Sequence, residues 1–205
     1  MQLRINKHLH RIQRPSLRHI NVALFVVIIL LDSYIAAAPL LPTVVARPRT
    51  LNATQAQNFV ATHKASNVPA APQPNQLIIP AMQLDQPIYE GTDTYAELDK
   101  GVWHWPGSST PDKGSNTVLL GHRFTYTTPR GVFYFLDVVK VGDEISIEWN
   151  NILYTYRVYQ TEVVTPDHVE ILDPTAEPTL TIYTCTPTWW PVNRLVVKAH
   201  LERQG

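Results

Sequence analysis

The chain begins with a basic, polar stretch that gives way to a long apolar segment. Residues 20–31 are apolar except for Asn21, and after Asp32 and Ser33 a second apolar stretch continues to residue 41. The 22 residues from 20 to 41 match the roughly 20 residues that a helix needs to cross a hydrocarbon core of about 30 Å. A buried core helix is a poorer interpretation, because nothing before this segment has apolar surface to pack against it. The pattern predicts a basic N-terminus over residues 1–19 and a transmembrane signal anchor over residues 20–41.

The charges that flank this segment predict its orientation. Five cations precede it, namely Arg4, Lys7, Arg11, Arg14 and Arg18. The next cation, Arg47, comes only after the segment has ended. Cytoplasmic flanks carry an excess of Lys and Arg, so the N-terminus is expected in the cytoplasm and the remainder outside, on a single-pass protein of the cell membrane.

A cleaved signal peptide is the alternative to an anchor. Ala36 and Ala38 offer an A-x-A cleavage site, but Pro39 would directly follow the cut, which disfavours cleavage. Asp32 weakens the anchor slightly, since an acid at the midplane costs about 2.5–3.5 kcal/mol on insertion scales. Either way, the rest of the chain is expected to be exported.

Residues 42–76 are rich in Pro, Ala, Asn, Gln and Thr and carry few large apolar side chains. Residues 51–64 have the length of a short helix but little apolar periodicity. We interpret residues 42–76 as a tether between the membrane segment and a folded domain.

From residue 77 onward the pattern changes to short runs of β-branched and aromatic residues separated by turn signals. In the run from Ile145 to Trp149, apolar and polar residues alternate as in a half-buried strand. Strands are expected over residues 77–79, 116–121, 132–139, 144–149, 152–164, 179–184 and 194–201, with a helical turn over 168–172. At least seven strands without a long helical period predict an all-β domain over residues 77–205, either a closed barrel or a sandwich.

Charge and composition exclude several classes of function. The 205 residues have a formal net charge of zero, but residues 1–76 hold eight Lys or Arg and one Asp, whereas residues 77–205 hold nine Lys or Arg and sixteen acids. An acidic domain is a poor nucleic-acid binder. The single Cys excludes an intramolecular disulfide and a Cys-based zinc site. With 17 Pro and 8 Gly, a glycine-rich phosphate-binding fold is not expected.

Cys185 is the first candidate for chemistry. It follows the apolar run 179–184, and Pro187 breaks any continuation, so the thiol is expected at a strand end. A lone Cys is often just a small buried hydrophobe. In an exported chain, however, an unpaired thiol is a liability unless its reactivity is used.

A nucleophilic Cys needs a base and a group that stabilises developing charge. His122 comes directly after the apolar run 117–121, and the other candidate partners are His104, His168 and His200. Arg194 begins the last expected strand, either as a solvated strand end or as a permanent cation whose donors stabilise an oxyanion. Spacing alone does not decide among these alternatives.

Taken together, these residues resemble the motifs of a known family. The run Thr181-Ile182-Tyr183-Thr184-Cys185, with Arg194 nine positions later, resembles the Thr-Leu-x-Thr-Cys motif and following Arg of the sortases, with Ile in place of Leu. Leu120-Gly121-His122-Arg123, in which the His lies 63 positions before the Cys, is similar to the family's Gly-His element. Residues 101–107, Asn116 and residues 167–174 also resemble family segments, so that the likeness covers about residues 77–201.

The sortases are membrane-anchored cysteine transpeptidases of mainly Gram-positive bacteria, and the resemblance implies a closed eight-stranded β-barrel with short helical turns. It implies that Cys185 cleaves an LPxTG-like sorting signal between Thr and Gly and forms a thioester. An amine from a peptidoglycan precursor or a pilin lysine then resolves it, anchoring proteins to the cell wall or joining pilins. His122 would act as general acid and base and Arg194 would hold the carbonyl oxygen, without a metal or other cofactor.

The resemblance also suggests where substrate binds. The segment 186–193 joins the Cys strand to the Arg strand, and by family analogy it contributes to specificity. Trp189 and Trp190 are expected either to bind substrate or to fold back onto the barrel, and Thr184 either to contact substrate or to support Cys185. The chain lacks the lid with an Asp-aromatic plug of pilin-polymerising enzymes, which favours a housekeeping enzyme of the broad D/E-like group.

Two other functions fit the same residues. A membrane-tethered cysteine protease would form the same thioester and hydrolyse it. A non-catalytic extracellular binding module on the same barrel would leave Cys185 unreactive. An L,D-transpeptidase fits less well, because its Ser-His-Gly-Cys-like run is absent.

Overall fold

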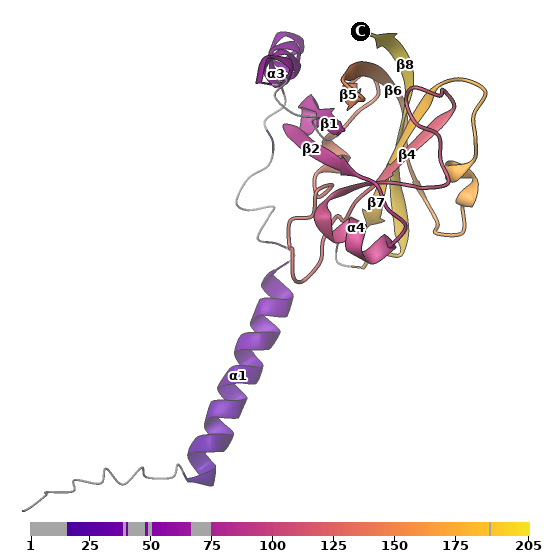
Figure 1. Cartoon of the computed structure of the whole chain (residues 1–205). Helices are drawn as coiled ribbons and strands as arrows, with labels where there is room; N and C mark the ends of the chain where they lie inside the picture. The colour runs from indigo at the N-terminus through magenta and orange to yellow at the C-terminus, as the bar shows by residue number, and fades with distance from the viewer. Residues whose placement is uncertain (1–15, 39, 41–47, 49–50, 67–74, 189) are drawn as a thin grey trace, which may run out of the picture. The chain divides into compact units, whose positions relative to one another are not determined.

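The computed structural model describes residues 16–38, 40, 48, 51–66, 75–188 and 190–205. The chain divides into two units, Met1–Ala38 and Pro39–Gly205. In the first unit, the helix α1 covers Leu17–Ala37 (Figure 1). None of its residues is buried, and its apolar side chains are exposed. Its 21 residues have a mean hydropathy of 2.3. Among the described residues, α1 is the one helix long and apolar enough to cross a membrane.

The α1 helix agrees with the expected apolar segment in type but begins three residues earlier, at Leu17. Residues 1–15 of the expected basic N-terminus lie outside the described residues, as do residues 39 and 41 at the end of the expected anchor and residues 42–47, 49–50 and 67–74 of the expected tether.

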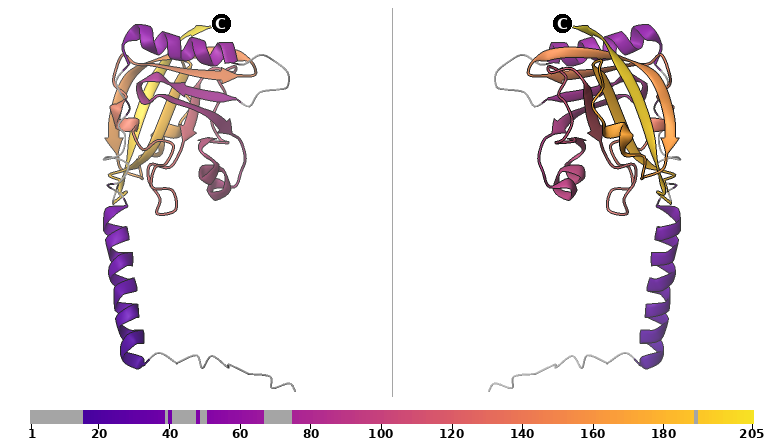
Figure 2. Two further views of the ribbon diagram at one scale, coloured as in Figure 1. Left: turned by 90° about the vertical axis from the view of Figure 1, so that its left-hand side faces the viewer. Right: turned by 90° about the vertical axis from the view of Figure 1, so that its right-hand side faces the viewer.

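The second unit is built on a closed barrel of eight strands in the order β1-β2-β3-β4-β7-β8-β6-β5 (Figures 1 and 2). The strands are β1 (Gln76–Ile79), β2 (Leu84–Tyr89), β3 (Val102–His104), β4 (Asn116–Leu120), β5 (Glu144–Trp149), β6 (Ile152–Val164), β7 (Thr179–Thr186) and β8 (Asn193–Gln204). Neighbouring strands are antiparallel except for β2 with β3 and β4 with β7, which are parallel. The expectation of a closed eight-stranded, all-β barrel is confirmed.

The helix α3 (Ala53–Ser66) precedes the barrel. The connections between strands carry the short helix α4 (Thr94–Lys100) and the 3-10 turns η1 (Pro80–Met82), η2 (Leu136–Val138) and η3 (Val169–Leu172). The helical turn expected over 168–172 is η3, and the segment 51–64 does form a helix, α3. By contrast, β2, β3 and α4 were not predicted. Asp93 caps α4 by accepting hydrogen bonds from the amides of Tyr95 and Ala96, both at 3.1 Å.

The prediction of a strand over residues 132–139 is wrong. This segment forms turns and η2, because Phe133, Tyr134, Phe135 and Leu136 are all buried. A strand would place consecutive side chains on opposite faces, whereas this irregular segment buries four in succession. Its backbone forms hydrogen bonds within the segment instead, for example from the Leu136 amide to the Phe133 carbonyl at 3.2 Å.

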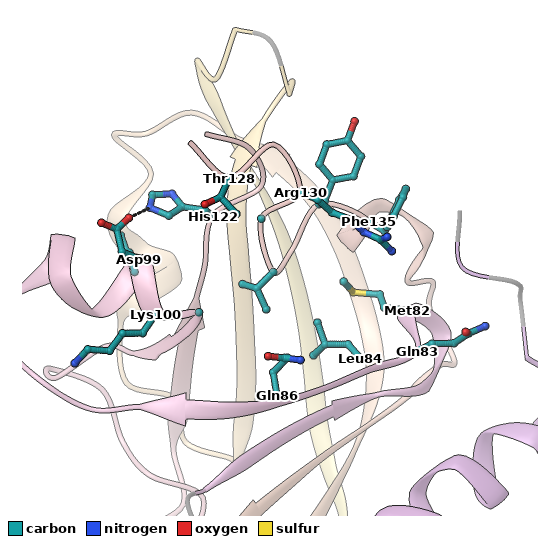
Figure 3. A pocket seen from close by; sticks show the side chains of 15 residues that line it. Met82, Gln83, Leu84, Gln86, Asp99, Lys100, His122, Thr128, Arg130 and Phe135 are labelled. Atoms are coloured by element: carbon teal, nitrogen blue, oxygen red, sulfur yellow. Dashed lines mark ion pairs between the residues drawn. The ribbon is translucent and has the colours of Figure 1, made fainter. Parts of the chain in front are cut away.

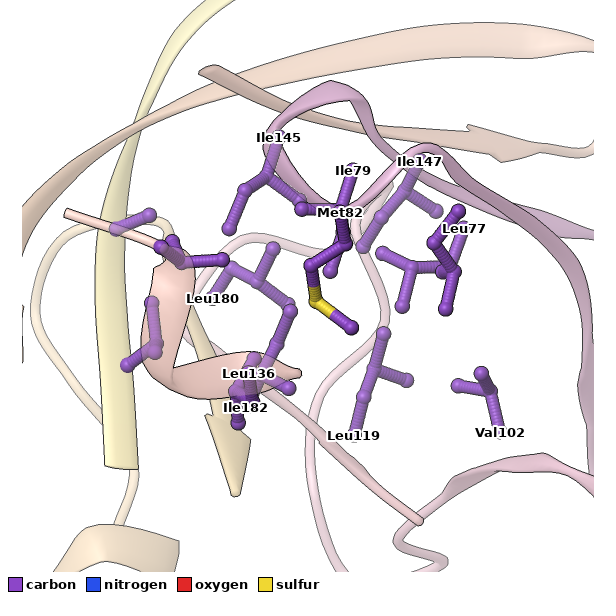
Figure 4. Packing of buried hydrophobic residues seen from close by; sticks show 14 of the residues in the cluster. Leu77, Ile79, Met82, Val102, Leu119, Leu136, Ile145, Ile147, Leu180 and Ile182 are labelled. Atoms are coloured by element: carbon purple, nitrogen blue, oxygen red, sulfur yellow. The ribbon is translucent and has the colours of Figure 1, made fainter. Parts of the chain in front are cut away.

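Leu136 is part of the apolar core that fills the barrel, where it meets side chains from most of the strands (Figure 4). Alternate residues supply this core. Leu119 of β4 and Leu180 and Ile182 of β7 are fully buried in it. The residues that alternate with them along each strand, such as Val118 in β4 and Thr181 in β7, therefore lie on the outer face of these strands.

Asn116, at the start of β4, fastens the long connection between β6 and β7 to that outer face. Its Nδ2 donates to the carbonyl oxygens of Ile171 at 3.0 Å and Asp173 at 2.9 Å, and its Oδ1 accepts from the Thr181 hydroxyl at 2.7 Å. Asn116 is 3% exposed, so water cannot replace these partners. One side chain thus joins β4, β7 and the η3 segment.

We expect Asn116→Ala to lower the free energy of unfolding by about 2–4 kcal/mol, because it leaves buried polar partners unsatisfied. Thr181→Val removes only the third hydrogen bond with little change of shape, and we expect a loss of about 1 kcal/mol. Urea denaturation of the full-length protein in detergent, followed by tryptophan fluorescence, measures both. Equal losses for the two variants would contradict this role of the Asn116 amide.

Candidate active site

The parallel pairing of β4 with β7 brings His122 next to Cys185. The ladder pairs Asn116 with Thr179 and runs to Leu120 beside Tyr183, always with an offset of 63 residues. His122 and Cys185 lie two residues beyond that last pair and keep the same offset. Cys185 is still within β7, where alternation places it on the same outer face as Tyr183. His122 follows the end of β4 outside any strand, and its side chain lines a pocket together with Met82, Leu84 and Phe135 of the barrel core.

Arg194 is the direct neighbour of Cys185 on the other side. The antiparallel ladder of β7 and β8 pairs Cys185 with Arg194, and residues directly opposite share a face, with Cβ atoms about 4.5–5.5 Å apart. The Arg194 guanidinium donates through Nη1 to the Asn193 carbonyl at 3.2 Å, which leaves its other N–H groups for further partners. Cys185 and Arg194 therefore stand side by side on β7 and β8, and His122 lies two residues beyond the end of the neighbouring strand β4.

Close backbone contacts hold His122 in place. The Thr184 hydroxyl donates to the Gly121 carbonyl at 2.8 Å, and the Phe133 amide donates to the His122 carbonyl at 3.0 Å. A Cβ at Gly121 would overlap the side chain of Val132, so only glycine lets that segment lie so close. Thr184 is 2% exposed, and this geometry favours the supporting role over substrate contact.

Arg123 links the segment that carries His122 to the strand that carries Cys185. Its Nη1 donates to the Thr186 hydroxyl at 2.9 Å and its Nη2 to Asp137 of η2 at 2.9 Å. The side chain is 12% exposed. A single guanidinium thus links the residue after His122 to the residue after Cys185, although the sequence marked Arg123 only as part of the Gly-His element.

Tyr183 lies two residues before Cys185 on β7 and therefore on the same face of the strand. Burial raises the pKa of Tyr183 to about 12, the Arg194 cation opposes that rise, and a negative charge on Cys185 adds to it. The phenol is therefore neutral at ordinary pH. The sequence analysis gave Tyr183 no role beyond its place in the motif.

A pocket of about 360 Å³ opens beside His122, on the side of β2 and β3 (Figure 3). Asp99, near the end of α4, lines it and points its carboxylate at the imidazole, with Oδ1 3.6 Å from His122 Nε2. The side chains of His122 and Asp99 are 31% and 79% exposed, so molecules in solution can reach both. Sequence reasoning missed Asp99, because it missed α4.

The other three candidate histidines lie away from Cys185. His104 is buried in β3, where Nε2 contacts the Ser109 carbonyl at 2.9 Å. His168 lies beside Glu170 in the η3 segment. His200 pairs with Thr179, six residues before Cys185 on β7. Of the four, His122 is the one that the register brings to the thiol.

Of the two tryptophans expected to bind substrate, Trp190 is 74% exposed and does not fold back onto the barrel. Trp189 lies outside the described residues. The loop between β7 and β8 therefore exposes the aromatic ring of Trp190 to solvent.

The chemistry available at this site is nucleophilic attack on a carbonyl. Cys185 is a free, half-buried thiol, His122 is placed to move a proton, and Arg194 is placed to stabilise an oxyanion. In the described part of the chain, no group of three or more His, Cys, Asp or Glu side chains is arranged to hold a metal ion.

Comparison with known proteins shows the family to which the chain belongs. Residues 77–202 match the model of the sortase domain family. Sortase D of Bacillus subtilis strain 168 is 32% identical over 127 residues, which are 62% of this chain and 61% of the relative. The chain spans 55–61% of the length of the three curated relatives it matches.

Two solved structures are similar throughout the barrel. Sortase C1 of GBS Pilus Island 1 has a TM-score of 0.57 and 28% identity, covering 75% of this chain and 85% of that structure. The Clostridium perfringens Sortase D5 transpeptidase has a TM-score of 0.57 and 26% identity, covering 73% and 94%.

The bridge made by Arg123 gives a testable expectation. Arg123→Ala should raise amide hydrogen exchange by about tenfold in residues 121–124 and 184–187 together, since about 1.4 kcal/mol of local stability corresponds to that factor. Mass spectrometry of peptic fragments measures both segments. Thr186→Val, which loses one bond only, should give a smaller rise, and β5 should be unaffected. A rise confined to residues 121–124 would show that Arg123 does not couple the segments.

Proposed function

The chain belongs to the sortase family, and on that premise we propose that it cleaves an LPxTG-like sorting signal between Thr and Gly and transfers the acyl group to an amine. The observation that carries the proposal is the pairing of Cys185 directly opposite Arg194 on β7 and β8, with His122 two residues beyond the end of the neighbouring β4. A cysteine acyl transfer uses a thiol nucleophile, a group that moves protons and a group that stabilises the oxyanion, and these three side chains are able to supply them.

In the proposed first half-reaction, the Cys185 thiolate attacks the carbonyl carbon of the scissile Thr–Gly bond. Arg194 lies opposite Cys185 and donates to the oxygen as negative charge develops there. His122 protonates the leaving amine, the carbon–nitrogen bond breaks, and the sorting signal remains attached as a thioester. The thiolate is the nucleophilic form of a cysteine side chain.

In the second half-reaction, an amine attacks the thioester carbonyl. Neutral His122 accepts the proton that the amine loses, the carbon–sulfur bond breaks, and Cys185 leaves as a thiolate. The acceptor that we propose is an amine of a peptidoglycan precursor or the side chain of a pilin lysine. Transfer to it would anchor the substrate protein to the cell wall or join pilins.

Helix α1 fits the role of a membrane anchor for this enzyme. Its 21 residues give a length of about 31 Å at 1.5 Å per residue, and Lys and Arg precede it in the sequence. We place the N-terminus in the cytoplasm and the barrel outside the membrane. The likeness to Sortase D of B. subtilis supports the D/E-like group.

The test uses full-length protein in detergent micelles, an LPxTG-type peptide and a glycine-based amine. Mass spectrometry should detect a thioester on Cys185 and the transpeptidation product, and Cys185→Ala should abolish both. His122→Ala and Arg194→Ala should each lower kcat/KM by about a hundredfold or more, the range for general acid–base catalysis and for loss of an oxyanion donor.

Arg194→Lys is the matched control, since it keeps the charge but loses the planar fork of donors, and we expect an intermediate loss. Thioester that ends only as hydrolysed peptide with every amine would identify a protease instead. The absence of any adduct with a broad LPxTG-type library would contradict catalysis and favour a binding module.

A further inference from the structure

The pocket beside His122 has a feature that the acylation chemistry leaves unused. Asp99 lies at the end of α4, just before β3, and His122 just after β4, while Cys185 and Arg194 lie opposite each other on β7 and β8. In the proposed reaction the acyl group occupies the side of Cys185 and Arg194. The other face of His122 is open to the pocket, where Asp99 Oδ1 lies 3.6 Å from Nε2.

We propose that this pocket is the binding site of the acyl acceptor, a protonated primary amine, and that Asp99 is the carboxylate that recognises its ammonium group. The inference rests on the proposed function and names the acceptor side of the same site. Asp99 and His122 lie together at one end of the pocket, and the Gln86 side chain points into the pocket from β2 (Figure 3).

The charges of the pocket agree with a cation at that end. Lys100 directs its ammonium to Glu97, with both carboxylate oxygens at 2.9 Å, and so does not compete for Asp99. The Arg130 guanidinium lies over the Phe135 ring, 5.0 Å from its centroid, at the other end of the pocket (Figure 3). Asp99 is thus the anion of the pocket nearest to the proton-transfer group.

The placement also fits the proton chemistry of the second half-reaction. The ammonium held by Asp99 gives one proton to His122 Nε2, and the nitrogen lone pair then attacks the thioester carbonyl carbon. The carbon–sulfur bond breaks, Cys185 leaves as a thiolate, and the second proton of the former amine goes to water. The thiolate–imidazolium pair is restored for the next cycle.

Competition between two acceptors tests the proposal. Full-length protein in detergent micelles receives an LPxTG-type peptide and a mixture of Nα-acetyl-lysine amide, whose side chain is cationic, and hydroxylamine, which is uncharged at neutral pH. The two acceptors compete for the same thioester, so the ratio of their products reports on acceptor binding whatever the rate of acylation.

We expect Asp99→Asn to lower the ratio of lysine product to hydroxylamine product about fivefold, the factor for loss of an exposed charge pair. Asp112→Asn is the matched control, because it removes an exposed carboxylate from the connection at the opposite end of β4, and it should leave the ratio unchanged. Gln86→Lys should lower the ratio and Gln86→Glu should raise it, because they add opposite charges to the same pocket.

An unchanged product ratio in Asp99→Asn would overturn the proposal. This includes the case in which the lysine product and the hydroxylamine product both decline by the same factor, because Asp99 would then only orient His122. Gln86 variants without effect would show that the amine does not enter through this pocket. Failure of the proposed function is distinct, because the unmodified protein would then form no thioester and no product with either acceptor, and this inference would fall with it.

Discussion

The parallel hydrogen-bond ladder between β4 and β7 is the constraint on which the site depends. Its fixed offset of 63 residues brings the segment that carries His122 to the end of β7 that carries Cys185, although the two are far apart in the sequence. A slip of one residue would turn Cys185 to the barrel interior. The core residues Leu119, Leu180 and Ile182 prevent that slip, because the same shift would expose them to solvent.

Around this ladder the structure adds supports that each fix one side of the site. Asn116 holds the η3 segment at the start of the ladder, and Arg123 bonds to Thr186 just beyond the other end of the ladder. Gly121 allows the irregular segment after it to pack directly on the backbone that carries His122. The reactive side chains therefore rest on strands and buried contacts, with the exposed loop of Trp190 at the edge.

Much of this could be predicted from the sequence, because alternation and motif spacing are local signals. Ile145 and Ile147 are buried as their alternation predicts. The segment 132–139 was misjudged because its apolar composition resembles a strand, while burial of consecutive residues requires a turn. Strand β2 was missed because it contains Pro87, which the barrel tolerates, since β3 pairs only with Ile88 and Tyr89. Without α4, nothing in the sequence connected Asp99 to His122.

The central claim is that His122 and Cys185 are neighbours, and disulfide trapping tests it directly. Cys185 is the single cysteine of the chain, so His122→Cys creates one possible pair. Adjacent register positions on neighbouring strands lie within the range of Cα separations that a disulfide bridges. Under mild oxidation, intact-mass measurement should show loss of two hydrogens for His122→Cys and none for Arg123→Cys, which faces inward. No disulfide in His122→Cys, or equal formation in both variants, would contradict the account.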